Sequence, residues 1–297
     1  MTQNLRTIRD FTRFAMTRLS QTNASLGHGS EDLWQEATFL VLRSLALPFD
    51  RLESFWDAAL TRKEATRVLD LIEKRTEQKI PAAYLLNEAW LTGHKFYVNE
   101  NVLIPRSFIA ELLNDELTPW VQDSESVISV LDLCTGSGCL AILANEAFPN
   151  ARVVGADISE AALTVAKKNV EDYGLTNSVE LIRSDVFSNL KNRYFDVILC
   201  NPPYVTDQAM ANLPAEYRKE PALALEAGSD GMDFMRRFMP DLRGHLTENG
   251  MAFVEIGDGR DAFEAIWPNL VVTWLETSAG ENMVFCVNAA DLKNAGL

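Results

Sequence analysis

The four residues Asn201-Pro202-Pro203-Tyr204 directly follow the apolar run from Phe195 to Cys200. Two prolines in a row remove two backbone N–H donors and fix two φ angles, so the loop is stiff and its carbonyl groups are free to accept hydrogen bonds. Asn201 offers an amide donor and an acceptor, the Pro202 carbonyl offers a second acceptor, and Tyr204 offers a ring that can stack against a flat group. The tetrapeptide therefore predicts a pocket for a planar NH₂ group, with a structural turn as the alternative.

A glycine-containing turn, Cys134-Thr135-Gly136-Ser137-Gly138, follows a second apolar run and precedes a helical pattern. Glycines in such a turn let backbone N–H groups and a helix N-terminus approach a ligand closely. The spacing differs from the dinucleotide pattern G-x-G-x-x-G only in having Ala141 at the third position, a tolerated variant. The turn therefore indicates a nucleotide-like ligand, and its glycine spacing alone leaves a dehydrogenase open.

Two acidic residues, Asp157 and Asp185, stand at or just after the ends of the next two predicted strands. A carboxylate at the first position can accept hydrogen bonds from ribose hydroxyls, with a helix cap or a solvated acid as the alternative. Ligands of parallel-sheet folds bind in the crevice outside the carboxyl ends of the strands. The three strand ends therefore predict one common cleft.

Strand and helix patterns alternate from residue 127 onward. Seven short apolar runs are predicted to be strands: 127–133, 152–156, 179–183, 195–200, 251–256, 271–275 and 283–287. The helical patterns that accompany them cover 139–147, 160–173, 231–246 and 261–267. Apolar strands that alternate with helices indicate an α/β fold, with a Rossmann-like, mostly parallel sheet of seven strands covered on both faces.

Residues 1 to about 80 carry helix signals only. Their apolar spacing predicts a helix after Ser30, a second from Leu52 to Leu60, and a third from Arg67 to Lys79. Pro81 ends the third, because proline disfavours helical geometry in the preceding residue.

Two β-type runs, around Gly93 and around Asn99–Asn101, follow the helical part and are typical of a hairpin or connector. Ser107 is then expected to cap an amphipathic helix that reaches about Leu117. We therefore expect a small helical domain at residues 1–82, a β-hairpin connector at 83–106 and a catalytic domain at 107–297.

The 297 residues include 27 basic and 42 acidic side chains, a net charge of −15. Residues 1–120 carry 14 basic and 16 acidic side chains, a balance of −2, whereas residues 121–297 carry 13 and 26, a balance of −13. Such acidity disfavours direct nucleic-acid binding, which uses Lys and Arg to replace counterions, and it suits a basic protein partner.

Other classes of protein are disfavoured by apolar content and cysteine spacing. No stretch approaches the roughly 18–20 consecutive apolar residues of a membrane span, and the N-terminus is too charged for a secretory signal. The four cysteines show no CxxC spacing, so we expect neither a disulfide framework nor a zinc or other metal site. A cytoplasmic protein without membrane attachment is expected.

In this order, the glycine turn, Asp157, Asp185 and Asn201-Pro-Pro-Tyr resemble class I S-adenosylmethionine-dependent methyltransferases that modify planar amino groups. More narrowly, the helical N-terminal part resembles the protein glutamine methyltransferases, over nearly the whole chain. The motifs that carry this narrower resemblance are Ala83-Tyr-Leu, Leu103-Ile-Pro-Arg106 and Glu220-Pro-Ala-Leu-Ala.

The glutamine methyltransferases divide into enzymes that act on peptide release factors and enzymes that act on the third protein of the large ribosomal subunit. Release-factor enzymes typically continue Pro-Arg with Pro-Asp/Glu-Thr-Glu, whereas this chain continues with Ser107-Phe-Ile-Ala-Glu-Leu. Asn87-Glu-Ala-Trp90 and Leu213-Pro-Ala-Glu-Tyr-Arg218 also resemble the ribosomal-protein branch. We therefore favour a basic ribosomal protein as substrate, with a release factor as the alternative.

The resemblance implies a role for each part of the predicted cleft. The Cys134–Gly138 turn, Asp157, Asp185, Val186 and Asn201 would contact the cofactor S-adenosylmethionine, with Ile158 against its adenine. Asn201, Pro202, Pro203 and Tyr204 would bind the substrate amide, and Asn201, Pro202 and Tyr204 would be catalytic. Arg106 would bind the substrate or shape the pocket, a plain surface arginine being the alternative, and the helical domain would recognise the substrate protein.

Three other functions compete with this one. A nucleic-acid methyltransferase acting on an exocyclic amine would also use an Asn-Pro-Pro-Tyr loop for a flipped base, but the acidic balance and the lack of a basic cluster argue against it. A non-catalytic cofactor-binding or assembly factor would not need an intact substrate loop. A dehydrogenase ranks last, because residues 201–204 have no role in hydride transfer.

Overall fold

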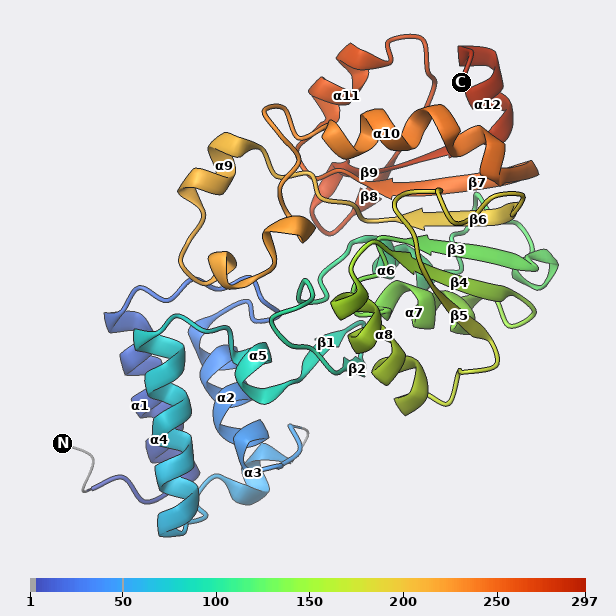
Figure 1. The fold of residues 1–297 in the computed structure, drawn as a ribbon. Helices are drawn as coiled ribbons and strands as arrows, with labels where there is room; N and C mark the ends of the chain where they lie inside the picture. Colours follow the sequence, from blue (N-terminus) through green and yellow to red (C-terminus); the bar gives the residue numbers. More distant parts are fainter. Residues whose placement is uncertain (1–3, 50) are drawn as a thin grey trace. The chain divides into compact units, whose positions relative to one another are not determined.

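The computed structural model describes residues 4–49 and 51–297 of the chain (Figure 1). It consists of two compact units. The helical unit combines the chain up to Ala89 with Val98–Glu100 and Pro214–Glu220, and the sheet unit contains Trp90–Tyr97, Asn101–Leu213 and Pro221–Leu297. The division into functional regions at residues 82 and 106 stays a prediction.

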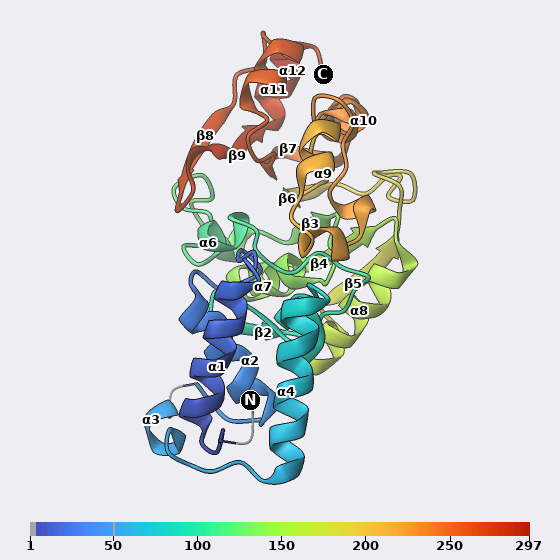
Figure 2. The ribbon, with the colours of Figure 1, turned by 90° about the vertical axis from the view of Figure 1, so that its left-hand side faces the viewer.

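The described residues of the helical unit form five α-helices: α1 (Ile8–Gln21), α2 (Leu33–Ser44), α3 (Leu52–Phe55), α4 (Arg62–Glu77) and α5 (Ala82–Leu86). The long helices α1, α2 and α4 pack side by side around one apolar core (Figure 2). Thr7 and Thr61 begin α1 and α4 with capping boxes, in which the threonine hydroxyl and an acid three residues later each satisfy a backbone N–H.

The predicted helix from Leu52 to Leu60 is wrong beyond Phe55. Trp56 and Asp57 form a turn instead, and the residues after them pair with the segment that leads into α1. Ile8 donates its backbone N–H to the Ala58 carbonyl at 3.1 Å, and Leu60 donates to the Arg6 carbonyl at 2.8 Å. Backbone pairing between segments about fifty residues apart thus replaces the helix that the local apolar spacing predicts.

A buried ion-pair cluster centred on Arg75 lies inside the helical unit. The Arg75 guanidinium donates to Glu36 at 2.5 Å, to Glu216 at 3.1 Å and to the Ser25 carbonyl at 2.8 Å. The exposed fractions of the three charged residues are 1%, 4% and 2%. Burial raises the pKa of Glu216, but hydrogen bonds from the Ser25 N–H and Arg75 outweigh it and hold that pKa below its usual value.

The short segment Pro214–Glu220 belongs to the helical unit because of such contacts. Besides the Glu216 pair, the Tyr217 hydroxyl donates to the Leu26 carbonyl at 3.2 Å. The Tyr217 ring lies 4.2 Å from the His28 ring, and a Glu220 carboxylate oxygen lies 3.5 Å from His28 Nε2. This segment contains most of the Leu213–Arg218 motif that marked the ribosomal-protein branch.

The sheet unit is built on seven strands: β3 (Ser129–Leu133), β4 (Arg152–Asp157), β5 (Val179–Arg183), β6 (Phe195–Cys200), β7 (Leu246–Glu255), β8 (Thr273–Thr277) and β9 (Gly280–Asn288). Their order is β5-β4-β3-β6-β7-β9-β8, and the pairs from β5 through β7 are parallel whereas β9 is antiparallel to β7 and to β8. The predicted mostly parallel, seven-stranded sheet is confirmed.

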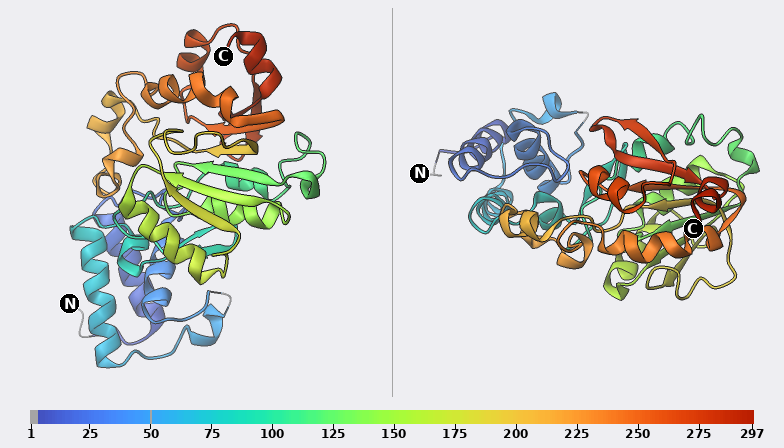
Figure 3. Two further views of the ribbon diagram at one scale, coloured as in Figure 1. Left: turned by 45° about the vertical axis from the view of Figure 1, so that its right-hand side comes forward. Right: turned by 90° about the horizontal axis from the view of Figure 1, so that it is seen from above.

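Helices cover both faces of the sheet, and each face has its own apolar core (Figures 1 and 3). One face carries α6 (Ile109–Leu113), α7 (Cys139–Ala147) and α8 (Glu160–Asp172), and the other carries α10 (Asp233–Leu242), α11 (Arg260–Ile266) and α12 (Ala289–Ala295). The central strand β3 is buried on both faces, as parallel strands between two helical layers are.

The connecting segments differ from the prediction in two respects. The β-type run expected around Asn99–Asn101 is not a strand, and residues 100 and 101 form a turn. The hairpin around Gly93 is confirmed as β1 (Ala89–Leu91) and β2 (His94–Phe96). The helix expected from Ser107 to Leu117 is wrong in its bounds: α6 covers only Ile109–Leu113, and its N-cap position is Phe108. Within the described ranges, no helix is long and apolar enough to cross a membrane.

The Arg75 cluster generates a stability prediction. Arg75→Met is expected to destabilise the protein by about 3–5 kcal/mol, because it leaves Glu36 buried without its cation and Glu216 with only Lys79, whose Nζ lies 3.8 Å away. Lys74→Met on the same helix is the matched control, since the Lys74–Asp70 pair is exposed and should contribute less than about 1 kcal/mol. Urea unfolding followed by tryptophan fluorescence measures both, and equal midpoints for the two variants would contradict a stabilising role of the cluster.

Candidate active site

Polar side chains gather where the central parallel strands end. The register pairs Leu133 with both Ala156 and Cys200, so the residues that come next in β3, β4 and β6 are level with one another. The chain adds β4 and β5 on one side of β3 and then β6 on the other, and this switch in direction creates the crevice in which such folds bind ligands. The residues that stand at this edge are Cys134, Asp157, Asn201 and, through the β6–β7 pairing, Glu255.

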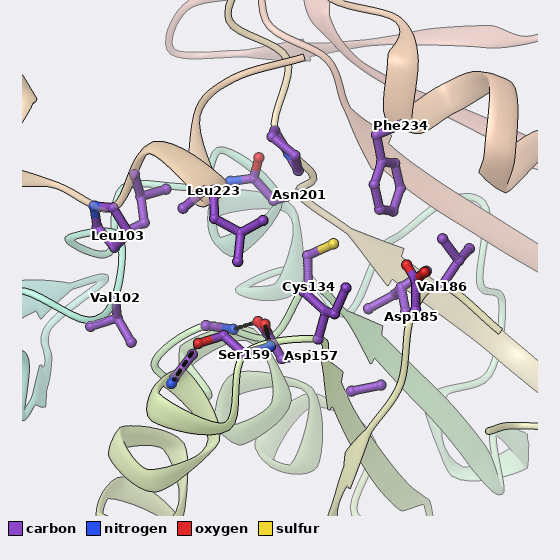
Figure 4. A pocket seen from close by; sticks show the side chains of 18 of the residues that line it. Val102, Leu103, Cys134, Asp157, Ser159, Asp185, Val186, Asn201, Leu223 and Phe234 are labelled. Atoms are coloured by element: carbon purple, nitrogen blue, oxygen red, sulfur yellow. Dashed lines mark hydrogen bonds between the residues drawn. The ribbon is translucent and has the colours of Figure 1, made fainter. Parts of the chain in front are cut away.

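A cavity of about 250 Å³ opens at this edge, and every residue that lines it belongs to the sheet unit. Many of the predicted site residues line it: Cys134, Gly136, Asp157, Ile158, Asp185, Val186, Asn201 and Pro203. Figure 4 shows Asn201 and Asp157 on opposite sides of Cys134, as the strand order requires. Thr135, Ser137, Gly138, Pro202, Tyr204 and Arg106 are not among the lining residues.

The turn after β3 has left-handed backbone conformations at three positions. The φ angles are +64° at Cys134, +53° at Gly136 and +80° at Gly138. A Cβ on Gly136 would meet nothing closer than a carbonyl oxygen at 3.9 Å, so the backbone is open there to a ligand. A Cβ on Gly138 would lie 3.2 Å from Ala166 of α8, so this glycine also allows α7 and α8 to pack closely. Cys134 adopts a conformation that favours glycine.

The buried carboxylate of Asp132 supports the turn from inside the sheet. It accepts a hydrogen bond from the Thr135 hydroxyl at 2.5 Å and another from the Ala141 N–H at 2.9 Å. Burial, at 1% exposure, raises the pKa of Asp132 to about 7 in spite of these bonds. Sequence reasoning missed this residue, although a single acid inside an apolar run is a usable signal. The same contacts explain why Thr135, a predicted cofactor contact, faces the interior.

Asp157 connects the turn to the start of α8. One carboxylate oxygen accepts from the Gly136 N–H at 2.9 Å and the other from the Ser159 N–H at 2.9 Å (Figure 4). Burial raises the pKa of Asp157, and the two backbone bonds oppose that shift. Because each carboxylate oxygen has two lone pairs, both can still accept a bond from a ligand hydroxyl. Ile158, next to it, is 40% exposed at the cavity.

The other predicted residues have partners within the protein. Asp185 lines the cavity and pairs with Arg237 of α10. In the loop after β6, Asn201 and Pro203 line the cavity whereas the Tyr204 hydroxyl donates to Glu255 at 3.2 Å. Arg106 donates to the Ile104 carbonyl at 3.4 Å. The structure therefore brings the Asn201–Tyr204 loop to the glycine turn, with only part of the loop at the cavity wall.

Several apolar lining residues were not predicted to be site residues, although Leu103 and Leu223 lie within motifs that carry the family resemblance. Val102 and Leu103 come from the segment after the hairpin, Leu223 from the segment after Pro221, and Phe234 from the start of α10 (Figure 4). They are apolar residues from separate parts of the chain, and only the fold brings them to one place. They give the cavity an apolar wall suited to a flat ring.

The charge of the cavity discriminates between ligands that use such a turn. The acidic lining residues are Asp157, Asp185, Glu226 and Asp233, and the basic lining residue is Arg237, which already pairs with Asp185. An acidic cavity disfavours the pyrophosphate of a dinucleotide and favours a cationic ligand with ribose hydroxyls and a flat ring. S-adenosylmethionine, a sulfonium nucleoside, has these properties, so the residues fit this cofactor.

Comparisons with known proteins identify the family to which the chain belongs. Residues 112–228 match the family model "Methyltransferase small domain". The ribosomal protein uL3 glutamine methyltransferase of Bordetella pertussis is 49% identical over 290 residues, which are 98% of this chain and 97% of that protein. Those of Burkholderia pseudomallei and Francisella tularensis are 50% and 40% identical, over 97% of this chain in each case and 96% and 92% of those proteins. With such identity over nearly its whole length, this chain is an S-adenosylmethionine-dependent methyltransferase and belongs to the family of ribosomal protein uL3 glutamine methyltransferases.

Proposed function

We propose that this protein transfers a methyl group from S-adenosylmethionine to the side-chain amide nitrogen of a glutamine in ribosomal protein uL3. The observation that carries the proposal is near-half identity to uL3 glutamine methyltransferases over almost the full chain. The position of the Asn201 amide at the wall of an acidic, partly apolar cavity supports it. A ribosomal-protein substrate also agrees with the cytoplasmic location that we expect for this enzyme.

Bound S-adenosylmethionine supplies a methyl group that is already electrophilic, so the task of the protein is to position the acceptor. An amide nitrogen is a poor nucleophile, because its lone pair is delocalised into the carbonyl. The Asn201 side-chain oxygen and the Pro202 carbonyl would accept the two amide protons and turn the nitrogen lone pair toward the methyl group. Such orientation contributes several kcal/mol to a transfer reaction.

The remaining roles follow from where the side chains lie. Asp157 and the Gly136 backbone would hold the ribose and the rest of the cofactor. Ile158 and Val186 would flank its adenine, and Asp185 would contact the cofactor on the same side as the adenine. Thr135, Ser137 and Gly138 would contribute through the backbone shape of the turn.

The proton released after methylation would pass to water, because no histidine lies at the cavity. In the described residues, His94 pairs with Glu146, His245 stacks on Phe187, and His28 packs against Tyr217. None of the three is a lining residue. Positioning therefore replaces general-base chemistry in this proposal.

The first test identifies the acceptor. The enzyme is incubated with methyl-labelled S-adenosylmethionine and an extract of cells that lack it, and labelled peptides are sequenced by mass spectrometry. We expect the label on a glutamine of uL3. Label on a release factor would move the assignment to the sister branch, and label on nucleic acid alone would refute protein methylation.

The second test distinguishes the residue that positions the acceptor amide from the residue that binds the cofactor. Asn201→Ala is expected to abolish methyl transfer while the cofactor Kd stays within about threefold, because the acceptor loses its positioning group. Asp157→Ala is expected to weaken cofactor binding roughly 10- to 100-fold, through loss of charge-assisted hydrogen bonds. Calorimetry measures binding, and transfer of labelled methyl groups measures turnover.

Asn150→Ala is the matched control for this test, because Asn150 is exposed and precedes the opposite, amino end of β4. It should bind the cofactor and turn over like the wild type. Near-normal turnover of Asn201→Ala would refute the proposed orientation of the amide.

The third test concerns the charge of the chain. Residues 121–297 carry a balance of −13, and a basic ribosomal protein would be steered toward them. We expect kcat/KM for uL3 to fall several-fold as salt rises from about 0.05 to about 0.5 M, because the Debye length shortens from about 14 to about 4 Å. Turnover measured at saturating uL3 is the control. A salt-independent kcat/KM would show that these acidic residues do not steer the substrate.

A further inference from the structure

Glu255 is a buried acid that stands beside the reactive loop. It is the last residue of β7, and its exposed fraction is 2%. Because β6 and β7 are parallel with Cys200 level with Val254, the residues that follow them, Asn201 and Glu255, are neighbours at the carboxyl edge of the sheet. The family match, the predicted site and the cavity lining leave this residue without a role.

The Glu255 carboxylate joins three segments that are distant in the sequence. One oxygen accepts from the Ser107 hydroxyl at 2.6 Å and from the Phe108 N–H at 2.8 Å. The other oxygen accepts from the Tyr204 hydroxyl at 3.2 Å. Glu255 thus connects the end of β7 both to the segment that follows Arg106 and to the last residue of the Asn201–Tyr204 loop.

Two glycines leave open the space that Tyr204 occupies. At Gly257, where φ is +53°, a Cβ would lie 2.7 and 2.8 Å from two carbons of the Tyr204 ring. At Gly231, where φ is +77°, a Cβ would lie 2.5 Å from the Tyr204 carbonyl oxygen. The backbone and ring of Tyr204 therefore fit into a space that only glycines leave open, and the bond to Glu255 fixes the far end of the side chain.

The charges around Tyr204 keep its hydroxyl protonated, so that it donates a hydrogen bond. Burial and the neighbouring Glu255 carboxylate raise the pKa of the Tyr204 hydroxyl well above its usual value, and the positive charge of Arg106 opposes that shift. Burial also raises the pKa of Glu255, while its bonds from Ser107, Phe108 and Tyr204 oppose the shift. Glu255 is not among the residues that line the cavity, so it is not placed to take a proton from the substrate.

We propose that Glu255 is a positioning residue for the methyl transfer. Through Tyr204 it holds the end of the reactive loop, so that the acceptors of Asn201 and Pro202 have one orientation, and through Ser107 it holds the segment that carries Arg106. The inference rests on the proposed function of the loop. The backbone after the loop is already paired, since the Val205 N–H donates to the Leu225 carbonyl at 2.7 Å and the Val205 carbonyl accepts from the Ala227 N–H at 2.9 Å. The bond from Tyr204 to Glu255 adds a side-chain anchor within the loop, and this anchor is what fixes the orientation of Asn201 and Pro202.

The experiment is a double-mutant cycle of Glu255→Gln, which replaces the charged acceptor of this hydrogen bond by a neutral amide, and Tyr204→Phe, which removes its donor. Each is expected to lower kcat roughly 10- to 100-fold while the KM for the acceptor protein and the cofactor Kd change less than about threefold. The double variant is expected to lose no more than the more damaged single variant, because both changes remove one interaction.

Glu111→Gln is the matched control, since it makes the same carboxylate-to-amide change at a half-buried residue that bonds to Ser278 on a surface turn. It should keep wild-type kcat. Urea midpoints are recorded for every variant, and Tyr204→Phe keeps the test valid if Glu255→Gln does not fold.

Additive losses in the cycle, or a fall in stability with unchanged kcat, would refute the inference. The acceptor is whichever protein the wild-type enzyme labels in the extract, so the cycle tests Glu255 even if that protein is not uL3. An unlabelled uL3 would contradict the proposed function, whereas an unchanged kcat in Glu255→Gln would contradict only this inference.

Discussion

The register of the parallel strands at the centre of the sheet is the constraint on which the site depends. Leu133, Ala156 and Cys200 are level in β3, β4 and β6, and the residues that follow them meet at one edge. A shift of one strand by one residue would exchange the faces of every side chain in it, so that its apolar side chains would no longer fit the two cores that they now fill. The burial of the strands on both faces therefore also fixes where the cofactor turn, Asp157 and Asn201 lie.

Two buried acids, Asp132 and Glu255, then hold the loops that leave this edge. A carboxylate inside a protein loses its hydration, and that loss raises the pKa of both residues. Each offsets part of this cost by accepting hydrogen bonds from separate segments: Asp132 from the turn and α7, Glu255 from the Arg106 segment and the reactive loop. Burying these two carboxylates thus lowers the folding stability, but the hydrogen bonds that they accept give both loops defined shapes before any ligand binds.

The sequence allowed the strands of the sheet and the ends that carry chemistry to be predicted, because both depend on short patterns. Apolar runs that alternate with helices are local, and so is the placement of Asp157 and Asn201 at strand ends. The family prediction, which used motifs along the whole chain, is confirmed. Contacts between distant residues could not be predicted: Ser107 bonds to Glu255, and Ala58 pairs with Ile8 instead of continuing a helix.

The glycine turn alone does not distinguish between two classes of ligand, whereas the charge of the cavity does. Glycines at 136 and 138 give a close backbone approach, and that geometry suits a pyrophosphate and a sulfonium nucleoside equally well. The acidic lining residues do not suit both ligands equally, because they repel phosphate and attract a cation; they are Asp157, Asp185, Glu226 and Asp233. These acids come from three separate parts of the chain, so their common sign is a property of the fold. In this enzyme the turn sets how closely a ligand can approach, and the surrounding carboxylates determine which ligand it is.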